Sequence, residues 1–351
     1  MFVCEGDRVF NICSRRPNSS EPAATLLASA VDTEPYSFSS DGNRLILLEM
    51  GDERRFLSLD LTDFSAPPDP LEVAGTGRIS APALSPDGRW LYSGGYDDRI
   101  GIWPLADPQP APERMLVAHE GWVRWIRTSP DGSLLASCGN DNLLKLWDTR
   151  TWELVRVFEG HKRYPYAVVF HPDGKRLASF DLMGVIKEWN IGSGKVTRQW
   201  EAKFMWGFDQ KFRADMGGAR DMRFSPDGKY LAVAGLTEVT NAFAGTHKPM
   251  VLLMDWETGE FKKKLKIDSR GMAWGIRFHP EGFLVGSGAP SGSLWFWKLD
   301  GDKPFHTFKL SGGGRALDLS PDGDRTSTRL NSSHKPLSYA VFCLINKPSN
   351  P

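Results

Sequence analysis

Residues 118–148 read AHEGWVRWIRTSPDGSLLASCGNDNLLKLWD, and two features of this stretch recur along the chain. The first is the turn Ser129-Pro-Asp-Gly132, in which proline presets the first corner, aspartate bonds back to the backbone and glycine supplies a positive φ angle. Strand-like runs flank this turn, so it predicts a β-hairpin. The second feature is Trp147, which ends an apolar run 15 residues after Gly132.

The turn motif divides the chain into similar segments. Seven such turns end at Gly42, Gly88, Gly132, Gly174, Gly228, Gly282 and Gly323. The intervals between these glycines are 46, 44, 42, 54, 54 and 41 residues, close to the roughly 40 to 45 residues of one propeller blade. An apolar marker follows the glycine by 15 residues at Leu57, Trp103, Trp147, Trp189 and Trp297. Two markers in step predict an all-β fold built from one repeated unit.

Residues 118–161 resemble the WD40-repeat family, in Ala118-His119, the run from Leu135 to Asp141, Leu146-Trp147-Asp148 and Gly160-His161. The resemblance covers about residues 35–323, and the chain looks like a fragment of a bacterial-type WD-repeat protein. It implies a seven-bladed WD40 β-propeller. It also implies that a His, a Ser or Thr, an Asp and a Trp are hydrogen-bonded within each blade. The matching positions are His119, Ser137, Asp141 and Trp147, which we interpret as a structural tetrad, because buried polar groups need partners.

Two blades depart from the tetrad pattern. The blade with His161, Ser179 and Trp189 has Met183 where the aspartate belongs. The blade with Ser93, Asp97 and Trp103 has no matching histidine. We expect both blades to be more loosely held.

Strands from both chain ends are expected to close the last blade, because an open edge would leave strand groups unpaired. Residues 315–320 supply one strand, and residues 2–6, 7–13 and 24–28 resemble the other three. The propeller is therefore assigned to residues 1–323. Residues 324–351 break from the repeat and resemble translated adapter sequence, so they are expected to be a non-native or disordered tail. The alternative is an ordinary strand at residues 338–345.

The two 54-residue intervals contain insertions. Twelve extra residues follow Trp189, and eleven lie between the second and third strands of the next blade, where Met254 replaces the expected tryptophan. In the WD-repeat arrangement both connections open on one face, so the insertions should meet. The loops of rigid scaffolds carry binding residues, and the predicted partner-binding patch comprises Trp206, Phe208, Phe212, Arg213, Phe243 and His247. Alternatively, the aromatic residues form a lid over blade 5 and contact no partner.

Composition and motifs limit the classes of function that the chain can have. The 43 basic and 43 acidic residues balance, which removes the simplest electrostatic argument for binding nucleic acid or an anionic membrane. Scattered cysteines and an N-terminus without an apolar core favour a cytoplasmic, non-secreted protein. Motifs for hydrolases, nucleotide loops, zinc proteases and haem attachment are missing, so no catalysis, metal or cofactor is expected. We predict a non-catalytic scaffold for protein partners. The alternative is a propeller enzyme or ligand-sensing module with a site in the central channel.

Overall fold

A computed structural model describes residues 79–105, 112–239, 247–290 and 292–309 continuously. It also describes the separate strands at residues 10–14, 24–29, 33–38, 44–50, 54–60, 69–71, 313–319, 325–331 and 340–344. Within these residues the secondary structure is almost entirely β, with one 3-10 turn, η1 (Lys203–Met205). In the described part of the chain, no helix is long and apolar enough to cross a membrane.

Six sheets of four antiparallel strands follow one another along the chain. Blade 1 comprises β3 (Thr33–Phe38), β4 (Arg44–Met50), β5 (Arg54–Asp60) and β6 (Asp69–Leu71). Blade 2 comprises β7 (Ile79–Leu84), β8 (Trp90–Gly95), β9 (Arg99–Pro104) and β10 (Arg114–Val117). Blade 3 comprises β11 (Val123–Thr128), β12 (Leu134–Gly139), β13 (Leu144–Asp148) and β14 (Leu154–Phe158).

The next three blades have the same antiparallel order. Blade 4 comprises β15 (Pro165–Phe170), β16 (Arg176–Asp181), β17 (Val185–Asn190) and β18 (Val196–Glu201). Blade 5 comprises β21 (Asp221–Phe224), β22 (Tyr230–Thr237), β23 (Lys248–Asp255) and β24 (Phe261–Lys266). Blade 6 comprises β25 (Gly271–Phe278), β26 (Phe283–Pro290), β27 (Ser293–Lys298) and β28 (His306–Lys309).

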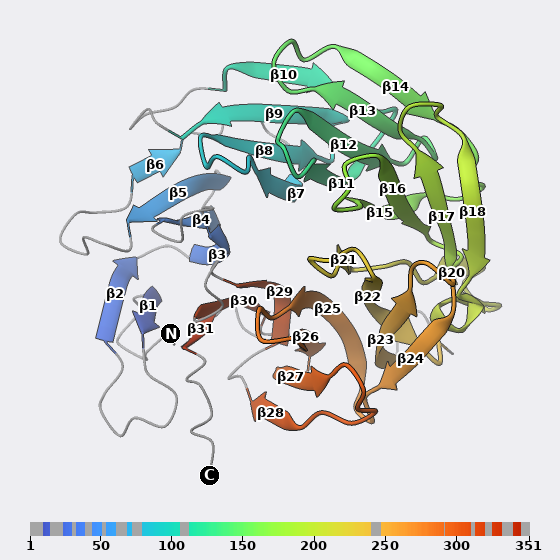
Figure 1. The fold of residues 1–351 in the computed structure, drawn as a ribbon. Coiled ribbons are helices and arrows are strands. Elements are labelled where there is room, and N and C mark those ends of the chain that lie inside the picture. Colours follow the sequence, from blue (N-terminus) through green and yellow to red (C-terminus); the bar gives the residue numbers. More distant parts are fainter. Residues whose placement is uncertain are drawn as a thin grey trace.

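The seventh blade joins the two ends of the chain. Its sheet contains β29 (Gly313–Leu319), β30 (Arg325–Asn331) and β31 (Ala340–Leu344). β1 (Phe10–Ser14) contacts β31 and pairs with β2 (Ala24–Ser29). The inner strands β3, β7, β11, β15, β21, β25 and β29 contact one another in this order, and β29 also contacts β3. The seven blades therefore form a closed ring (Figure 1).

The ring confirms the seven-bladed propeller closed by both chain ends, but the contribution of each end differs from the expected one. One strand was expected from the C-terminal end, and the structure has three. β30 pairs antiparallel with β29, and β31 pairs antiparallel with β30. β31 lies where the alternative strand at residues 338–345 was placed. The strand expected at residues 2–6 lies outside the described residues. The assignment of residues 324–351 as a tail stays a prediction.

The tryptophan markers occupy equivalent places in the third strands. Trp103, Trp147, Trp189 and Trp297 pair with Leu91, Leu135, Leu177 and Leu284 of the second strands. Met254 takes this place in blade 5, opposite Leu231, as predicted. In blade 1 the prediction of Leu57 was wrong: Leu59 lies opposite Leu45, because the β4–β5 hairpin is two residues longer than its counterparts.

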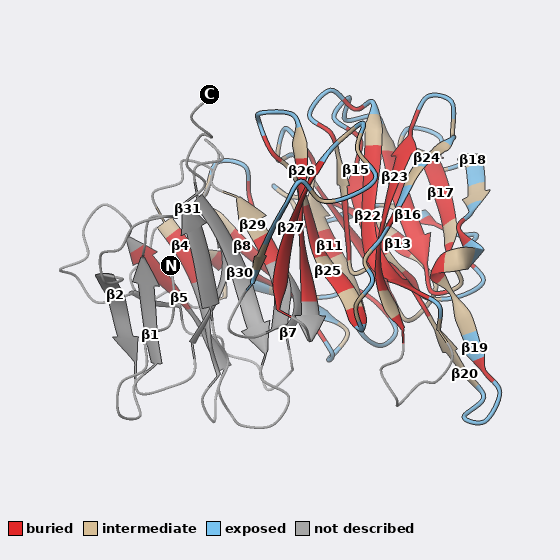
Figure 2. Cartoon of the chain, turned by 90° about the horizontal axis from the view of Figure 1, so that it is seen from below, coloured by how far each residue is buried: buried red, intermediate tan, exposed pale blue. Residues whose placement is uncertain are grey.

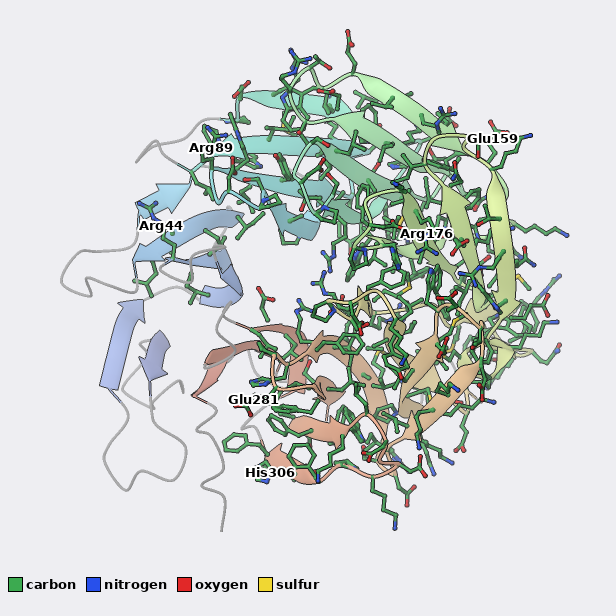
Figure 3. All side chains as sticks on the ribbon, viewed as in Figure 1. Arg44, Arg89, Glu159, Arg176, Glu281 and His306 are labelled. Carbon is green, nitrogen blue, oxygen red and sulfur yellow. The ribbon has the colours of Figure 1, made fainter. Side chains whose placement is uncertain are left out.

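The core lies between neighbouring blades. Trp103, Trp189 and Trp297 are at most 1% exposed, as is Trp256 of blade 5. Buried residues run through the thickness of the disc, while exposed residues concentrate at the loops (Figure 2). Side chains fill the space between the sheets of blades 2 to 6 (Figure 3), so these blades are stabilised mainly by packing on the blades beside them.

Candidate functional site

The polar tetrad of blade 3 is an unbroken hydrogen-bonded chain. The Trp147 indole N–H donates to Ser137 Oγ at 3.0 Å, and Ser137 Oγ lies 2.8 Å from His119 Nε2. His119 Nδ1 lies 2.9 Å from Asp141 Oδ1. With Asp141 ionised, Nδ1 must carry the proton, so Nε2 accepts from the serine hydroxyl. The structure thus brings all four side chains together.

Blade 4 contains the same network with a different aspartate. Trp189 Nε1 donates to Ser179 Oγ at 2.8 Å, Ser179 Oγ lies 2.7 Å from His161 Nε2, and His161 Nδ1 lies 3.0 Å from Asp181 Oδ2. The expectation that this blade lacks the aspartate of the tetrad was therefore wrong. Asp181 is the last residue of β16, two residues after the serine rather than four, and its Oδ1 also accepts the N–H groups of Met183 and Val185.

Blade 2 keeps only part of the network. Trp103 Nε1 donates to Ser93 Oγ at 2.9 Å. A Cβ placed on Gly95 would meet the Asp97 carboxylate, whereas a Cβ on the equivalent Gly139 would meet the His119 ring. The aspartate therefore fills the space that the histidine fills in blade 3, which explains how the blade closes without a histidine.

Both tetrad histidines are held neutral. Burial lowers the pKa of His119 and of His161, and the hydrogen bonds that they donate to Asp141 and Asp181 offset this only in part. Neutral, buried and fully bonded imidazoles stabilise the blades and leave no free nitrogen for acid–base chemistry. In the described part of the chain, no group of three or more His, Cys, Asp or Glu residues could hold a metal ion.

The first insertion forms a small hairpin at the edge of the disc. It contains β19 (Gly207–Asp209) and β20 (Ala214–Met216), which pair antiparallel and project beyond the neighbouring strands at the lower right of Figure 2. Asp209 Oδ1 accepts the N–H groups of Lys211 and Phe212 and holds the turn. Phe208 and Phe212 are 42% and 44% exposed at its end, an arrangement suited to contact with a partner.

The two insertions meet, as the loop geometry of the repeat predicts. Thr237 Oγ1 donates to the backbone oxygen of Phe204 at 2.6 Å. A Cβ on Gly207 would lie 2.8 Å from Cβ of Val239, so the two backbones approach closely there. We call the face that carries these insertions, the blade-to-blade connections and the turns between second and third strands the insertion face.

The six predicted patch residues are in different environments. Phe208, Phe212 and Arg213 are exposed, with Arg213 at a positive φ of 49°. Trp206 is half-buried and donates to Asp215 Oδ1 at 3.1 Å. His247 is buried, and both burial and the nearby Arg220 lower its pKa. Phe243 lies outside the described residues.

A row of arginine and aromatic side chains, which was not predicted from the sequence, lies on the insertion face. We call it the arginine–aromatic ladder, and it comprises Tyr96, Trp122, Arg124, Tyr166, Arg220 and Trp274. The Tyr96 and Trp122 rings are 4.2 Å apart between centroids, edge to face. The Arg124 guanidinium carbon lies 4.8 Å from the ring centre of Trp122 and 4.6 Å from that of Tyr166.

The ladder continues across two more blades. The Arg220 guanidinium carbon lies 5.2 Å from the ring centre of Tyr166 and 5.4 Å from that of Trp274. Each of these distances is within the range of a cation–π interaction, about 6 Å. The ladder therefore links blades 2 to 6 at the insertion face, and Trp122 is still 42% exposed.

β-bulges position the ladder. The register of the inner strand shifts at Arg124 in β11, at Tyr166 in β15 and at Trp274 in β25. A bulge re-aims the extra side chain away from the sheet. These residues and Arg220 each lie eight residues before the turn glycine of their blade. That constant spacing was the available signal, but it does not show that a bulge is present.

The ring of blades defines the class: the fold is a seven-bladed β-propeller, and part of the chain carries WD40 repeats. The family described as WD domain, G-beta repeat matches residues 71–104, 111–148 and 152–190, which lie in blades 1 to 4. Protein groucho of Drosophila melanogaster is 32% identical over 121 residues, which is 34% of this chain and 17% of groucho. The chain thus spans under a fifth of this relative.

A solved structure shares the whole architecture. The structure described as Kuenenia stuttgartiensis Hydrazine Synthase superposes with a TM-score of 0.70, covering 88% of this chain and 94% of that one. The sequences are 19% identical. At this identity the likeness shows the fold alone, because one fold hosts many unrelated functions.

Proposed function

We propose that this chain is a non-catalytic scaffold that binds a protein partner on its insertion face. The observation that carries the proposal is the arginine–aromatic ladder, which spans five blades and keeps Trp122 exposed near one end. Trp, Tyr and Arg dominate the energetics of protein interfaces, because they bury large areas and retain polar groups. WD repeats generally serve as interaction scaffolds, which agrees with this reading.

The hairpin β19–β20 supplies the second contact region. The lid alternative fits Phe204, which packs against the blade 5 core and lies under Lys264, whose Nζ is 4.2 Å from the ring centre. It does not fit Phe208 and Phe212, which are exposed. We therefore assign Phe204 to packing and the two exposed phenylalanines to the partner contact, as a region separate from the ladder.

The proposal assigns no catalytic step, metal or cofactor to the chain, and it places the protein in the cytoplasm. The free thiol of Cys138 supports a reducing compartment: it is buried and donates to the backbone oxygen of Pro165 at 3.3 Å. No nucleic-acid or membrane surface is part of the proposal, since the chain carries no net charge.

Affinity capture with the full chain tests the proposed face. A partner identified with the wild-type protein is purified and its binding remeasured against two variants, Trp122→Ala and the pair Phe208→Ser with Phe212→Ser. We expect each to weaken binding about tenfold or more, as loss of an interface anchor does. The matched control is Val155→Ser, an equally exposed residue on outer strand β14. Unchanged binding in both variants, with the thermal transition intact, would refute the proposed face.

A further inference from the structure

The inner strands place arginines at one register position around the channel. Arg127, Arg223 and Arg277 pair with Ala136, Ala232 and Val285 of the second strands. Each of these partners directly follows the leucine that lies opposite the tryptophan or methionine marker of its blade. The corresponding residues of blades 2 and 4 are Ala83 and Val169. Three long cationic side chains therefore share one level of the ring with two short apolar ones.

One of these arginines, Arg127, reaches past the neighbouring blade. Arg127 Nη2 lies 3.2 Å from Asp221 Oδ1, although β15 separates β11 from β21 in the ring. A contact that passes over one blade has to run through the channel. Arg277 bonds to Asp221 and also to Asp318, whose Oδ1 lies 2.9 Å from Arg277 Nε. The short Val169 side chain leaves room for this crossing.

A cavity of about 440 Å³ lies beside the three guanidinium groups. Its rim is formed by prolines of the hairpin turns of four blades, Pro86, Pro130, Pro172 and Pro226, and its walls include Phe224. Such a volume suits a small organic ligand. The hairpin turns follow the inner strands, whereas the insertions precede them, so the cavity opens on the face opposite the insertion face.

Among the described side chains of the cluster, positive groups outnumber negative ones. Among its described side chains, three arginines share two carboxylates, Asp221 and Asp318. Arg223 is the least engaged, since its Nε lies 3.7 Å from Asp221 Oδ1, beyond hydrogen-bond distance. Burial and then the neighbouring Arg127 and Arg277 lower the pKa of Arg223 well below its usual value. Burial raises the pKa of Asp221, yet the three arginines together lower it to about 2. A further anion would relieve this imbalance.

We propose that this cavity, the channel anion site of Arg127, Arg223 and Arg277, binds a tetrahedral oxyanion of the phosphate type. Guanidinium groups donate in forks that match phosphate oxygens. Three such groups approach from blades 3, 5 and 6, and three oxygens of one tetrahedral anion can accept from all of them. A carboxylate has only two oxygens, so three guanidinium groups have to share them, as they do at Asp221. The oxyanion is either free or the head group of a small organic phosphate whose apolar part contacts the proline and phenylalanine walls.

Calorimetric titration of the full chain tests the site with two probes, inorganic phosphate and phenyl phosphate, at constant ionic strength. We expect saturable binding to one site in the wild type, and affinity at least about tenfold weaker in Arg223→Gln, because a charge-assisted hydrogen bond is lost. The matched control is Arg99→Gln, an exposed arginine at the start of β9, which should bind as the wild type does. Tighter binding of phenyl phosphate identifies an organic phosphate, and equal binding identifies the free anion.

A second variant tests the site independently of Arg223. Asp221→Asn removes the carboxylate that competes for the same guanidiniums, so we expect phosphate to bind more tightly than in the wild type. Equal phosphate affinity in the wild type and Arg223→Gln, or absence of saturable binding, overturns the proposal. Acetate binding as tightly as phosphate overturns the tetrahedral assignment. A nonspecific effect of salt would be the same in the wild type and in the variants, so it would not produce these differences in affinity. None of these outcomes bears on the scaffold proposal, which concerns the opposite face.

Discussion

At the scale of single residues, a serine hydroxyl organises each tetrad. Ser137 Oγ accepts the hydrogen bond of Trp147 and donates to His119, whose other nitrogen donates to Asp141. Removal of the hydroxyl would leave two buried groups without partners, which costs more than the lost bonds themselves. In blade 2, the bond from Trp103 is the one that Ser93 Oγ makes among the described side chains.

Ser137→Ala should lower the free energy of unfolding by about 2 to 4 kcal/mol, because an indole and an imidazole nitrogen are both orphaned. Ser93→Ala, the matched change in blade 2, should cost about half as much, because it orphans one group. Chemical denaturation of both variants measures the difference. Equal costs would show that the histidine bond contributes nothing to blade 3.

The neutral histidines make stability depend on pH. The folded pKa of His119 and His161 lies below the ordinary value of 6.5 that the unfolded chain retains. Above that value both states are neutral and the contribution to stability is fully present. As the pH falls below about 6.5, the unfolded chain binds protons first, so the free energy of unfolding should decrease.

Denaturant midpoints measured between pH 8 and pH 5 test this sign. Replacement of both histidines by glutamine should remove most of the decline seen in the wild type. Asp141 does not interfere in this window, since the His119 bond lowers its pKa below 3.8 despite the opposing effect of burial. A decline of the same slope in the double variant would assign the pH dependence to other groups.

At the scale of elements, loops and bulges decide what the insertion face presents. The hairpin β19–β20 has short strands of three residues each, and Asp209 holds its turn by accepting two backbone N–H groups. Short, exposed hairpins open locally more easily than blade strands do. The orientation of Phe208 and Phe212 therefore depends on this one carboxylate.

Asp209→Ala should raise hydrogen exchange at residues 207–216 at least several-fold and leave the thermal midpoint of the disc nearly unchanged. It should also weaken partner binding, because the two phenylalanines would no longer be held in place. The matched control is Asp227→Ala, a change in the blade 5 turn, where the carboxylate accepts from Ser225 and Lys229. Exchange at residues 207–216 as slow as in the wild type would contradict this role for Asp209.

At the scale of the whole molecule, the ring closes through blade 7. β29 contacts both β25 and β3, so it joins the last regular blade to the first. β30 pairs with β29 and also contacts β3. In repeat proteins each unit is stabilised by its neighbours, so a defect at the junction weakens the units on both sides.

Deletion of residues 324–351 should lower the thermal midpoint, because β29 would lose its only sheet partner among the described strands. Deletion of residues 345–351, which follow β31, serves as the control and should change the midpoint little. Differential scanning calorimetry compares the three proteins. A midpoint unaffected by the longer deletion would support the prediction that residues 324–351 form a tail without a structural role.

The repeat was readable from the sequence because it depends on local chemistry. A proline, an aspartate and a glycine at fixed positions specify each turn, and a large apolar residue follows at nearly constant distance. These signals predicted the seven blades and the substitution of Met254, and the resemblance to WD40 repeats implied the tetrad partners of blade 3. The marker spacing failed at Leu57, where the hairpin is longer. The expected position of the tetrad aspartate failed in blade 4, where Asp181, two residues before Met183, bonds to the histidine.

The ladder and the channel arginines were decided by the tertiary structure alone. Arg127 and Asp221 are 94 residues apart, and Arg220 meets Tyr166 from another blade. Such neighbours are set by the curvature that closes seven sheets into one ring and by bulges that turn single side chains. The sequence by itself determined which units form and how many there are. Their mutual orientation, which only packing can set, decided which charges and aromatic rings share a surface.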